Sequence, residues 1–203
     1  MSSLLSIKDL HVSFGNGPNS VDAVRGINLD VERGEIVGIV GESGSGKSAS
    51  MLSVLRLLPP TAHIRGSISF EGKDLFNASS REMRDVRGGK IGMIFQDPMT
   101  SLNPSFRIGA QIAEAIMQHS DVSTKVAVSK ATGLLEVVSI PRPSESMSLF
   151  PHELSGGMKQ RIMIAMAIAN EPELLIADEP TTALDVTIQA QILEVLRGLR
   201  ETR

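Results

Sequence analysis

The sequence has 203 residues, a formal net charge of −3 and no cysteine. This length can form one compact domain or two small lobes, and without cysteine these residues form no disulfide framework, thiolate metal site or cysteine nucleophile. The slightly acidic balance and the scarcity of aromatic residues, 3% of the chain, provide no basic patch and no stacking platform for bases. We therefore expect no nucleic-acid partner.

The first half of the sequence predicts short strands on both sides of a glycine-rich loop. Alternating apolar residues predict strands in the first 40 residues, with turn chemistry at 16–19. The run 35–40 is apolar after its first residue, which is typical of a strand buried on both faces of a parallel sheet. We expect a helix over 48–58, a hairpin over 66–73 and another short strand over 90–95.

The second half predicts a helical lobe inserted into an α/β chain at about 97–165. Ile108, Ile112 and Ile116 recur every four residues, as on one face of a helix. No apolar run approaches the roughly 20 residues that a membrane-spanning helix needs, so a cytoplasmic protein is expected. Further helices are expected over 126–138, 158–169 and 188–199, and a strand over 173–177.

The run Gly41-Glu42-Ser43-Gly44-Ser45-Gly46-Lys47-Ser48 matches the phosphate-binding pattern G-x-x-x-x-G-K-[ST]. Glycines let the backbone curl so that successive N–H groups face an anion, and the following helix adds its positive end. Lys47 can reach the β and γ phosphates of a nucleotide, and the Ser48 hydroxyl can bind Mg²⁺. The alternative is a chance Gly/Ser-rich turn, which the predicted strand before it and helix after it argue against.

The run Leu174-Leu175-Ile176-Ala177-Asp178-Glu179 places two carboxylates after a predicted buried strand. In α/β sheets ligands bind at this carboxyl end of the strands. Asp178 would hold Mg²⁺ through its water shell, and Glu179 would polarise an attacking water. The alternative is a strand that simply ends in two solvated acids. The phosphate-binding pattern elsewhere in the sequence makes this alternative the weaker one.

The run Leu154-Ser155-Gly156-Gly157-Met158 places a serine and two glycines at the start of a predicted helix. Exposed N–H groups and the helix dipole make such a start a second anion site. The residue chemistry alone favours an ordinary helix cap by Ser155. A second phosphate site would be redundant within one chain, so it would serve a nucleotide held by another subunit.

Together these motifs closely resemble the nucleotide-binding subunits of ATP-binding cassette (ABC) transporters. The resemblance implies a P-loop NTPase core of the ABC type over 1–96 and 166–203, with an antiparallel β subdomain, and an inserted helical subdomain over 97–165. It makes the three runs the Walker A loop, the Walker B strand and the signature motif, with Met158 where Gln is commoner. The implied catalytic residues are Glu179, Gln96 and Lys47; the implied ATP contacts are Phe14, Gly41, Ser43, Gly44, Ser45, Gly46, Lys47, Ser48, Ser155, Gly156, Gly157 and Asp185; the implied Mg²⁺ ligands are Ser48, Gln96 and Asp178.

Three of these positions rest on the resemblance alone. Gln96 matches the Q-loop glutamine, which would touch Mg²⁺ and the attacking water and link to the membrane subunit. Asp185, in Ala183-Leu184-Asp185, matches the D-loop that faces a partner subunit. Phe14 falls where the family stacks an aromatic ring on adenine, and a plain core phenylalanine is its alternative.

A narrower resemblance is to the dipeptide, oligopeptide and nickel importer ATPases. It rests on Phe95-Gln96-Asp97-Pro98-Met99-Thr100-Ser101-Leu102-Asn103-Pro104, on Phe150-Pro151-His152-Glu153 and on the run from Ala177 to Gln191. It implies a homodimer or heterodimer of ATP-binding subunits. Transmembrane permease subunits and, indirectly, a substrate-binding protein would complete an importer at the cytoplasmic face of the membrane.

The resemblance also implies a switch histidine on a strand beyond the last predicted helix. The sequence ends at Arg203, before that place, and His11, His63, His119 and His152 do not fit it. We therefore expect a chain that lacks the C-terminal strands, in which ATP binding is retained and hydrolysis is uncertain. The alternatives are a non-hydrolysing nucleotide-binding fragment and a soluble ABC ATPase without a transport role.

Overall fold

The computed structural model describes residues 3–17, 20–97 and 101–180. The chain divides into two compact units, Met1–Arg87 and Gly88–Arg203. The boundaries predicted for the core and the helical subdomain remain a prediction. Within the described ranges, no helix combines the length and apolar character that crossing a membrane requires.

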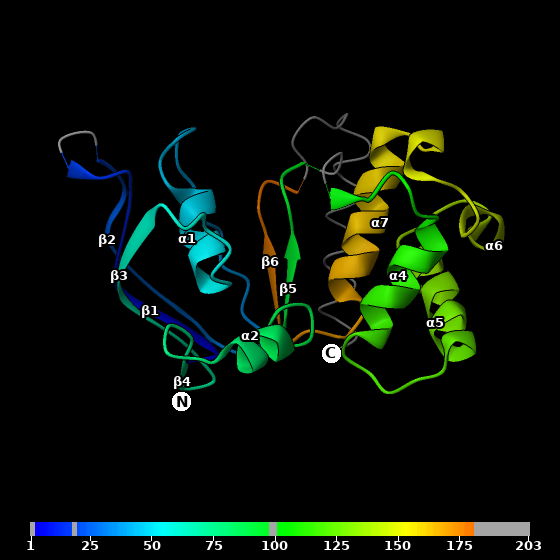
Figure 1. Ribbon diagram of the computed structural model, residues 1–203, viewed down its shortest axis with the longest axis horizontal. Helices are drawn as coiled ribbons and strands as arrows, with labels where there is room; N and C mark the ends of the chain where they lie inside the picture. The colour runs from blue at the N-terminus through cyan, green and yellow to red at the C-terminus, as the bar shows by residue number, and fades with distance from the viewer. Residues whose placement is uncertain (1–2, 18–19, 98–100, 181–203) are drawn as a thin grey trace. The chain divides into compact units, whose positions relative to one another are not determined.

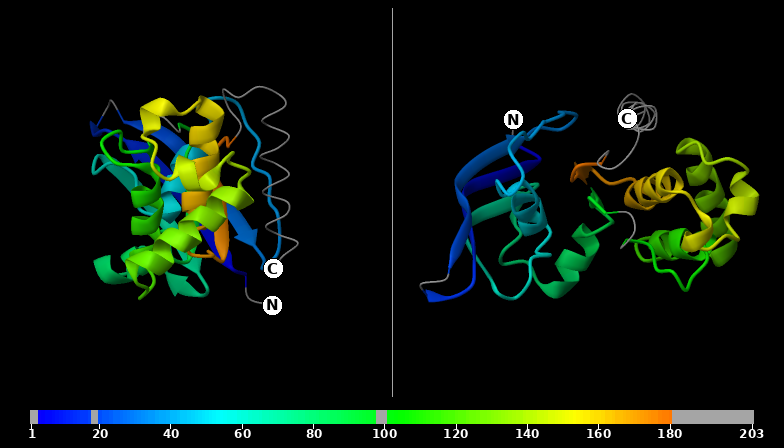
Figure 2. Two further views of the ribbon diagram at one scale, coloured as in Figure 1. Left: turned by 90° about the vertical axis from the view of Figure 1, so that its right-hand side faces the viewer. Right: turned by 90° about the horizontal axis from the view of Figure 1, so that it is seen from above.

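The first unit is built on an antiparallel sheet in the order β2-β1-β3-β4. The central strand β1 pairs along its length with both β2 and β3, so that Phe14 lies opposite Val21 on one side and Ala62 on the other. The helix α1 contacts β1 and β2 (Figures 1 and 2). The elements of this unit are β1 (Leu5–Phe14), β2 (Val21–Val31), α1 (Lys47–Val54), β3 (Ala62–Phe70), β4 (Lys73–Asp74) and α2 (Ser80–Val86).

The middle of β1 is irregular, and a glycine of β3 accommodates it. The register of both strand pairs shifts around Asp9, which has a φ of 47°. Gly66 has a φ of 102°, and a Cβ there would lie 2.3 Å from the Asp9 carbonyl oxygen. Only glycine allows this close approach, so Gly66 fixes the point where the two strands meet across the bulge.

The helix α2 is an element that the sequence interpretation missed. Its signal was a capping box: the Ser79 Oγ accepts a hydrogen bond from the Glu82 N–H, and the Glu82 carboxylate accepts one from the Ser79 N–H. The hydrogen bonds from the Ser79 side chain and backbone hold the pKa of Glu82 below its usual value. Seven residues with two buried apolar side chains, Met83 and Val86, are too short a pattern to stand out by periodicity.

The segment 35–40 contradicts the prediction of a buried strand. It is assigned to no strand and is exposed throughout, with Ile36 at 66% and Val40 at 96% exposure. A strand is buried by the strands and helices beside it, and no strand in the described part of the chain pairs with this segment. The prediction that this segment forms a buried strand is therefore wrong, because an apolar run does not by itself supply the neighbouring strands that would bury it.

The second unit combines two parallel strands with a cluster of helices (Figure 1). The strands pair in register, with Met93 opposite Ile176 and Ile94 opposite Ala177. All of β5 is buried, whereas in β6 only Ile176 is fully buried. The predicted Walker B strand is thus present, but less covered than its apolar sequence predicts. The elements are β5 (Ile91–Ile94), α4 (Ile108–Met117), α5 (Thr124–Val137), α6 (Pro143–Ser146), the 3-10 helix η2 (Pro151–Glu153), α7 (Gly156–Ile168) and β6 (Leu174–Ala177).

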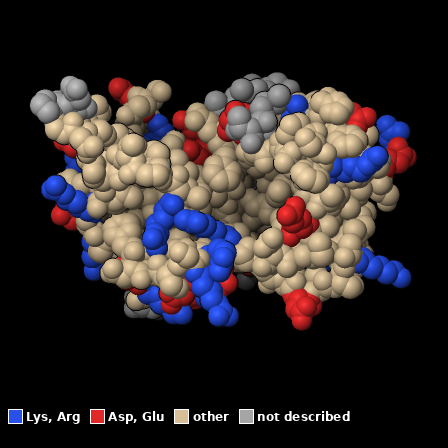
Figure 3. All heavy atoms as spheres, viewed as in Figure 1, with Lys and Arg blue, Asp and Glu red and all other residues tan. Residues whose placement is uncertain are grey.

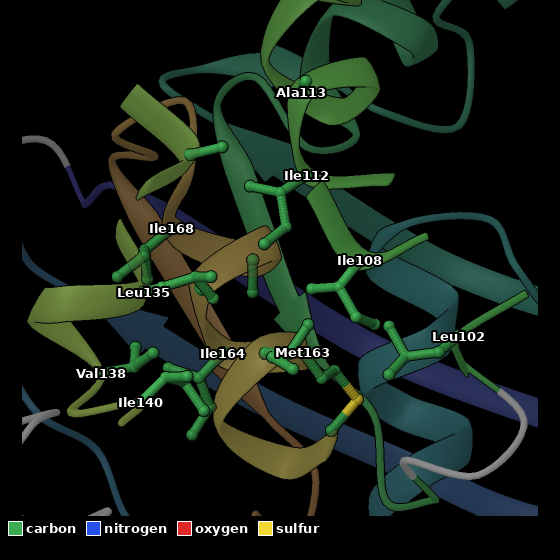
Figure 4. Close-up of a cluster of buried hydrophobic side chains, with 14 of the residues drawn as sticks. Leu102, Ile108, Ile112, Ala113, Leu135, Val138, Ile140, Met163, Ile164 and Ile168 are labelled. Carbon is green, nitrogen blue, oxygen red and sulfur yellow. The ribbon is translucent and has the colours of Figure 1, made fainter. Parts of the chain in front are cut away.

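The helices of the second unit enclose a continuous apolar core (Figure 4). The predicted stripe Ile108, Ile112 and Ile116 lies on α4, and all three side chains are 0–1% exposed. They pack with residues of α5 and α7, including Leu135 and Ile164. Burying each such side chain contributes roughly 1.5–3 kcal/mol, so this core holds the helices as one body.

The charged side chains on the face seen in Figure 3 are of both signs and lie scattered among uncharged ones. This distribution agrees with a formal net charge of only −3. A net charge this small favours partner binding through local groups of residues rather than through a field of one sign.

Candidate active site

The phosphate-binding loop of the first unit joins the exposed segment to α1. Gly46 has a φ of 93°, and a Cβ there would lie 2.2 Å from the Ala23 carbonyl oxygen, so the loop requires glycine at this position. The helix α1 begins at Lys47 without a side-chain cap. A helix start without a side-chain cap is the arrangement that the motif predicts for binding an anion.

Lys47 spans this loop. Its Nζ donates hydrogen bonds to the carbonyl oxygens of Gly41 (2.8 Å) and Glu42 (2.9 Å). The ammonium is thus held beside the same backbone whose N–H groups the motif directs at phosphate. A phosphate arriving there would meet a point charge already in place, which lowers the entropy cost of recruiting it.

A second group of predicted residues meets at the carboxyl end of β5 and β6. The Gln96 Nε2 donates a hydrogen bond to the Glu179 Oε2 at 3.0 Å, although the two residues are 83 positions apart in the sequence. The Asp178 N–H donates to the Ile94 carbonyl oxygen at 2.9 Å, and Asp178 is buried at 8% exposure. The parallel pairing of the strands is what brings these residues together.

The oxygens here are of the kind that Mg²⁺ prefers. Asp178 supplies a carboxylate and Gln96 an amide oxygen, which are hard ligands. The described residues hold no group of three or more His, Cys, Asp or Glu that could bind a metal ion by themselves. Mg²⁺ ordinarily needs only one or two protein oxygens, because it keeps several waters and shares its coordination with substrate phosphates.

Glu179 has a strained backbone. Its φ is 46°, in the left-handed region, and it precedes a proline, which ordinarily favours extended backbone in the residue before it. Such a conformation in a non-glycine residue costs of order 1–3 kcal/mol and persists only where its surroundings hold it. The turn therefore aims the carboxylate toward Gln96 at an energetic cost.

The predicted signature motif opens α7. The Ser155 Oγ accepts a hydrogen bond from the Met158 N–H at 3.3 Å, so Ser155 is the N-cap of this helix. A Cβ on Gly156 would meet nothing within 4 Å among the described residues. The packing of the described residues therefore does not by itself require glycine at this position.

The comparisons with known proteins agree with these motifs. The family model described as ABC transporter matches residues 24–182. The chain belongs to the ABC transporter family. The oligopeptide transport ATP-binding protein OppD of Bacillus subtilis is 54% identical over 98% of this chain and 56% of its own length. The dipeptide transport ATP-binding protein DppD of the same organism is 52% identical, over 98% of this chain and 60% of its own length.

The solved structures confirm the ABC ATPase fold. The ATP-binding cassette MJ0796, in a dimeric post-hydrolysis state bound to ADP and Pi, superimposes with a TM-score of 0.87. It is 28% identical, and the match covers 98% of this chain and 83% of MJ0796. This ABC chain spans a little under two thirds of the length of the curated relatives named above.

The other residues predicted for the nucleotide site have roles that remain predictions, and one of them lies outside the described residues. Phe14 is half-buried at the end of β1, in the unit that carries the Walker A loop. Its contact with adenine remains a prediction, as do the roles of Gly41, Ser43 and Ser48. Asp185 and the helix expected over 188–199 lie outside the described residues.

Gln160 is a residue to which the sequence interpretation assigned no role. It lies on α7, is only 2% exposed and donates a hydrogen bond from Nε2 to the Pro180 carbonyl oxygen at 2.6 Å. Its signal was available: Gln160 precedes Ile164 by one helical turn and so shares the apolar face of α7. A polar residue on such a face requires a partner, and here the partner follows Glu179.

Proposed function

We propose that this chain is the ATP-binding and ATP-hydrolysing part of an ABC importer of peptides. The observation that carries the proposal is the hydrogen bond between Gln96 and Glu179 at the ends of two paired parallel strands. An amide and a carboxylate held together in this way support a role in binding an attacking water and a metal-bound phosphate. The printed names of the relatives OppD and DppD support the peptide class over nickel.

In this proposal the residues divide the work between binding and hydrolysis. Lys47 and the N–H groups of the Walker A loop bind the phosphates, and Phe14 stacks on the adenine ring. Ser48, Gln96 and Asp178 are the protein ligands of Mg²⁺, which neutralises charge on the phosphates when it is bound. Glu179 accepts a proton from the attacking water.

The signature motif implies a second subunit. Ser155, Gly156 and Gly157 would bind the nucleotide of a partner, in a homodimer or a heterodimer, and Asp185 would face that partner. The open space around Gly156 among the described residues and the dimeric state of MJ0796 support this arrangement. The complete transporter would include transmembrane permease subunits, which place this chain at the cytoplasmic face of the membrane, and a substrate-binding protein that delivers the peptide.

The test compares two glutamates that flank the same strand, in the protein expressed from its complete reading frame. Glu179→Gln removes the proposed base, and we expect ATP turnover to fall by about 100-fold or more. Glu173→Gln, at the other end of β6 beside Lys90, should retain turnover within about twofold, because an exposed ion pair contributes little. Peptide uptake by cells should follow turnover in both variants. Unchanged turnover in Glu179→Gln would overturn the proposal.

A further inference from the structure

One contact of helix α7 with the segment around Glu179 is a buried amide. Gln160 is one of the few buried polar side chains of the described residues, and its Nε2 lies 2.6 Å from the Pro180 carbonyl oxygen. An amide in an apolar interior is stable only when it is hydrogen-bonded, so this contact is strongly favoured once formed. It fixes the position of the Pro180 carbonyl group, one residue after Glu179.

Glu179 needs such a restraint because its backbone is strained. The left-handed φ of 46° would relax if the chain on either side were free to rotate. On the N-terminal side, the Asp178 N–H is bound to the Ile94 carbonyl oxygen of β5. On the C-terminal side, Pro180 has no N–H to contribute, and its carbonyl oxygen is bound to Gln160.

We propose that Gln160 is a positioning residue for hydrolysis, which holds the left-handed turn at Glu179 and thereby its carboxylate. This inference rests on the proposed role of Glu179 and extends it to a residue that does not touch the nucleotide. From this turn the side chain of Glu179 reaches Gln96. Loss of the Gln160 hydrogen bond releases the turn, and the carboxylate then occupies its reactive position for a smaller fraction of the time.

The same contact also joins Glu179 to the signature motif. Gln160 lies one helical turn after Gly156, where α7 begins behind its cap Ser155. A helix transmits displacement of one end to the other as a stiff body. Contact of a nucleotide with the start of α7 is therefore linked, through Gln160 and Pro180, to the carboxylate that acts in turnover.

The experiment replaces Gln160 with an apolar residue of similar volume in the protein expressed from its complete reading frame. We expect Gln160→Leu to lower kcat for ATP by about tenfold or more, with the Kd for ATP within about twofold, because the Walker A loop is untouched. Gln111→Leu is the matched control. Gln111 is also a buried glutamine of the second unit, with hydrogen bonds to the backbone of Asn103 and Phe106, and its replacement should leave kcat within about twofold.

The outcomes separate this inference from the proposed function. If Glu179→Gln abolishes ATP hydrolysis but a folded Gln160→Leu variant hydrolyses ATP at the wild-type rate, the positioning role is wrong and the proposed function stands. An equal loss of kcat in Gln111→Leu would also overturn the positioning role, because it would reflect general destabilisation. If Gln160→Leu does not fold, Gln160→Asn keeps an amide but shortens its reach, and a normal kcat in that variant would count against the role.

Discussion

Two apolar segments of this ABC chain lead into functional motifs, and they have opposite surroundings. The segment 36–40 precedes the Walker A loop and is exposed, with Val40 at 96% exposure. The strand β5 precedes Gln96 and is buried along its whole length, with Ile94 at 0% exposure. Both are short runs of Ile, Val, Met and Gly, so composition does not account for the difference.

The difference comes from neighbours. The strand β5 pairs with β6 and is covered by α7, which approaches so closely that a Cβ on Gly92 would lie 2.2 Å from the Ala167 carbonyl oxygen. The segment 36–40 has no paired strand in the described ranges. An apolar run thus indicates that a segment can be buried. Whether it is buried depends on the strands and helices that pack against it.

The largest expected effect tests this comparison with matched truncations. In the 203-residue chain, Ile94→Ala should lower the free energy of unfolding by about 2–5 kcal/mol, because it leaves a cavity in a packed core. Val40→Ala should change it by no more than about 0.5 kcal/mol, because the side chain is already in solvent. Urea unfolding followed by circular dichroism measures both. Equal losses in the two variants would show that 36–40 is buried after all.

A smaller effect is expected from adding one methyl group to a glycine of each segment. Gly92→Ala forces α7 away from β5 and should cost about 1–3 kcal/mol of stability. A Cβ on Gly38 meets nothing within 4 Å, so Gly38→Ala should be neutral or stabilise by up to about 1 kcal/mol. The same unfolding measurement applies. A destabilising Gly38→Ala would contradict the open surroundings described for that segment.

Much of the fold and of the candidate site could be predicted from the sequence where the signal is local. The four-residue spacing of Ile108, Ile112 and Ile116 predicted α4, and the glycine-rich run before Lys47 predicted the loop that leads into α1. Strand β6 was predicted together with the two carboxylates that follow it, although the strand is partly exposed. Each of these signals lies within one turn, strand or helix face.

What could not be predicted depends on contacts between distant segments. The prediction that 35–40 is a buried strand was wrong, because the residues of the run do not specify which strand would pair with it. The bond between Gln160 and Pro180 spans 20 residues, and the strained φ of Glu179 is not visible in its residue type. The helix α2 was missed although Ser79 and Glu82 carry a capping box, because its apolar pattern is short.

We propose that the Walker A loop binds ATP and that Glu179 acts in its hydrolysis. The most direct test measures the Kd and the kcat for ATP side by side in two variants of the protein expressed from its complete reading frame. Lys47→Ala should weaken ATP binding by about tenfold or more, the loss expected for a charged hydrogen bond to phosphate. Glu179→Gln should bind ATP within about threefold of the wild type while its kcat falls about 100-fold or more. Unweakened binding in Lys47→Ala, or wild-type turnover in Glu179→Gln, would contradict the account.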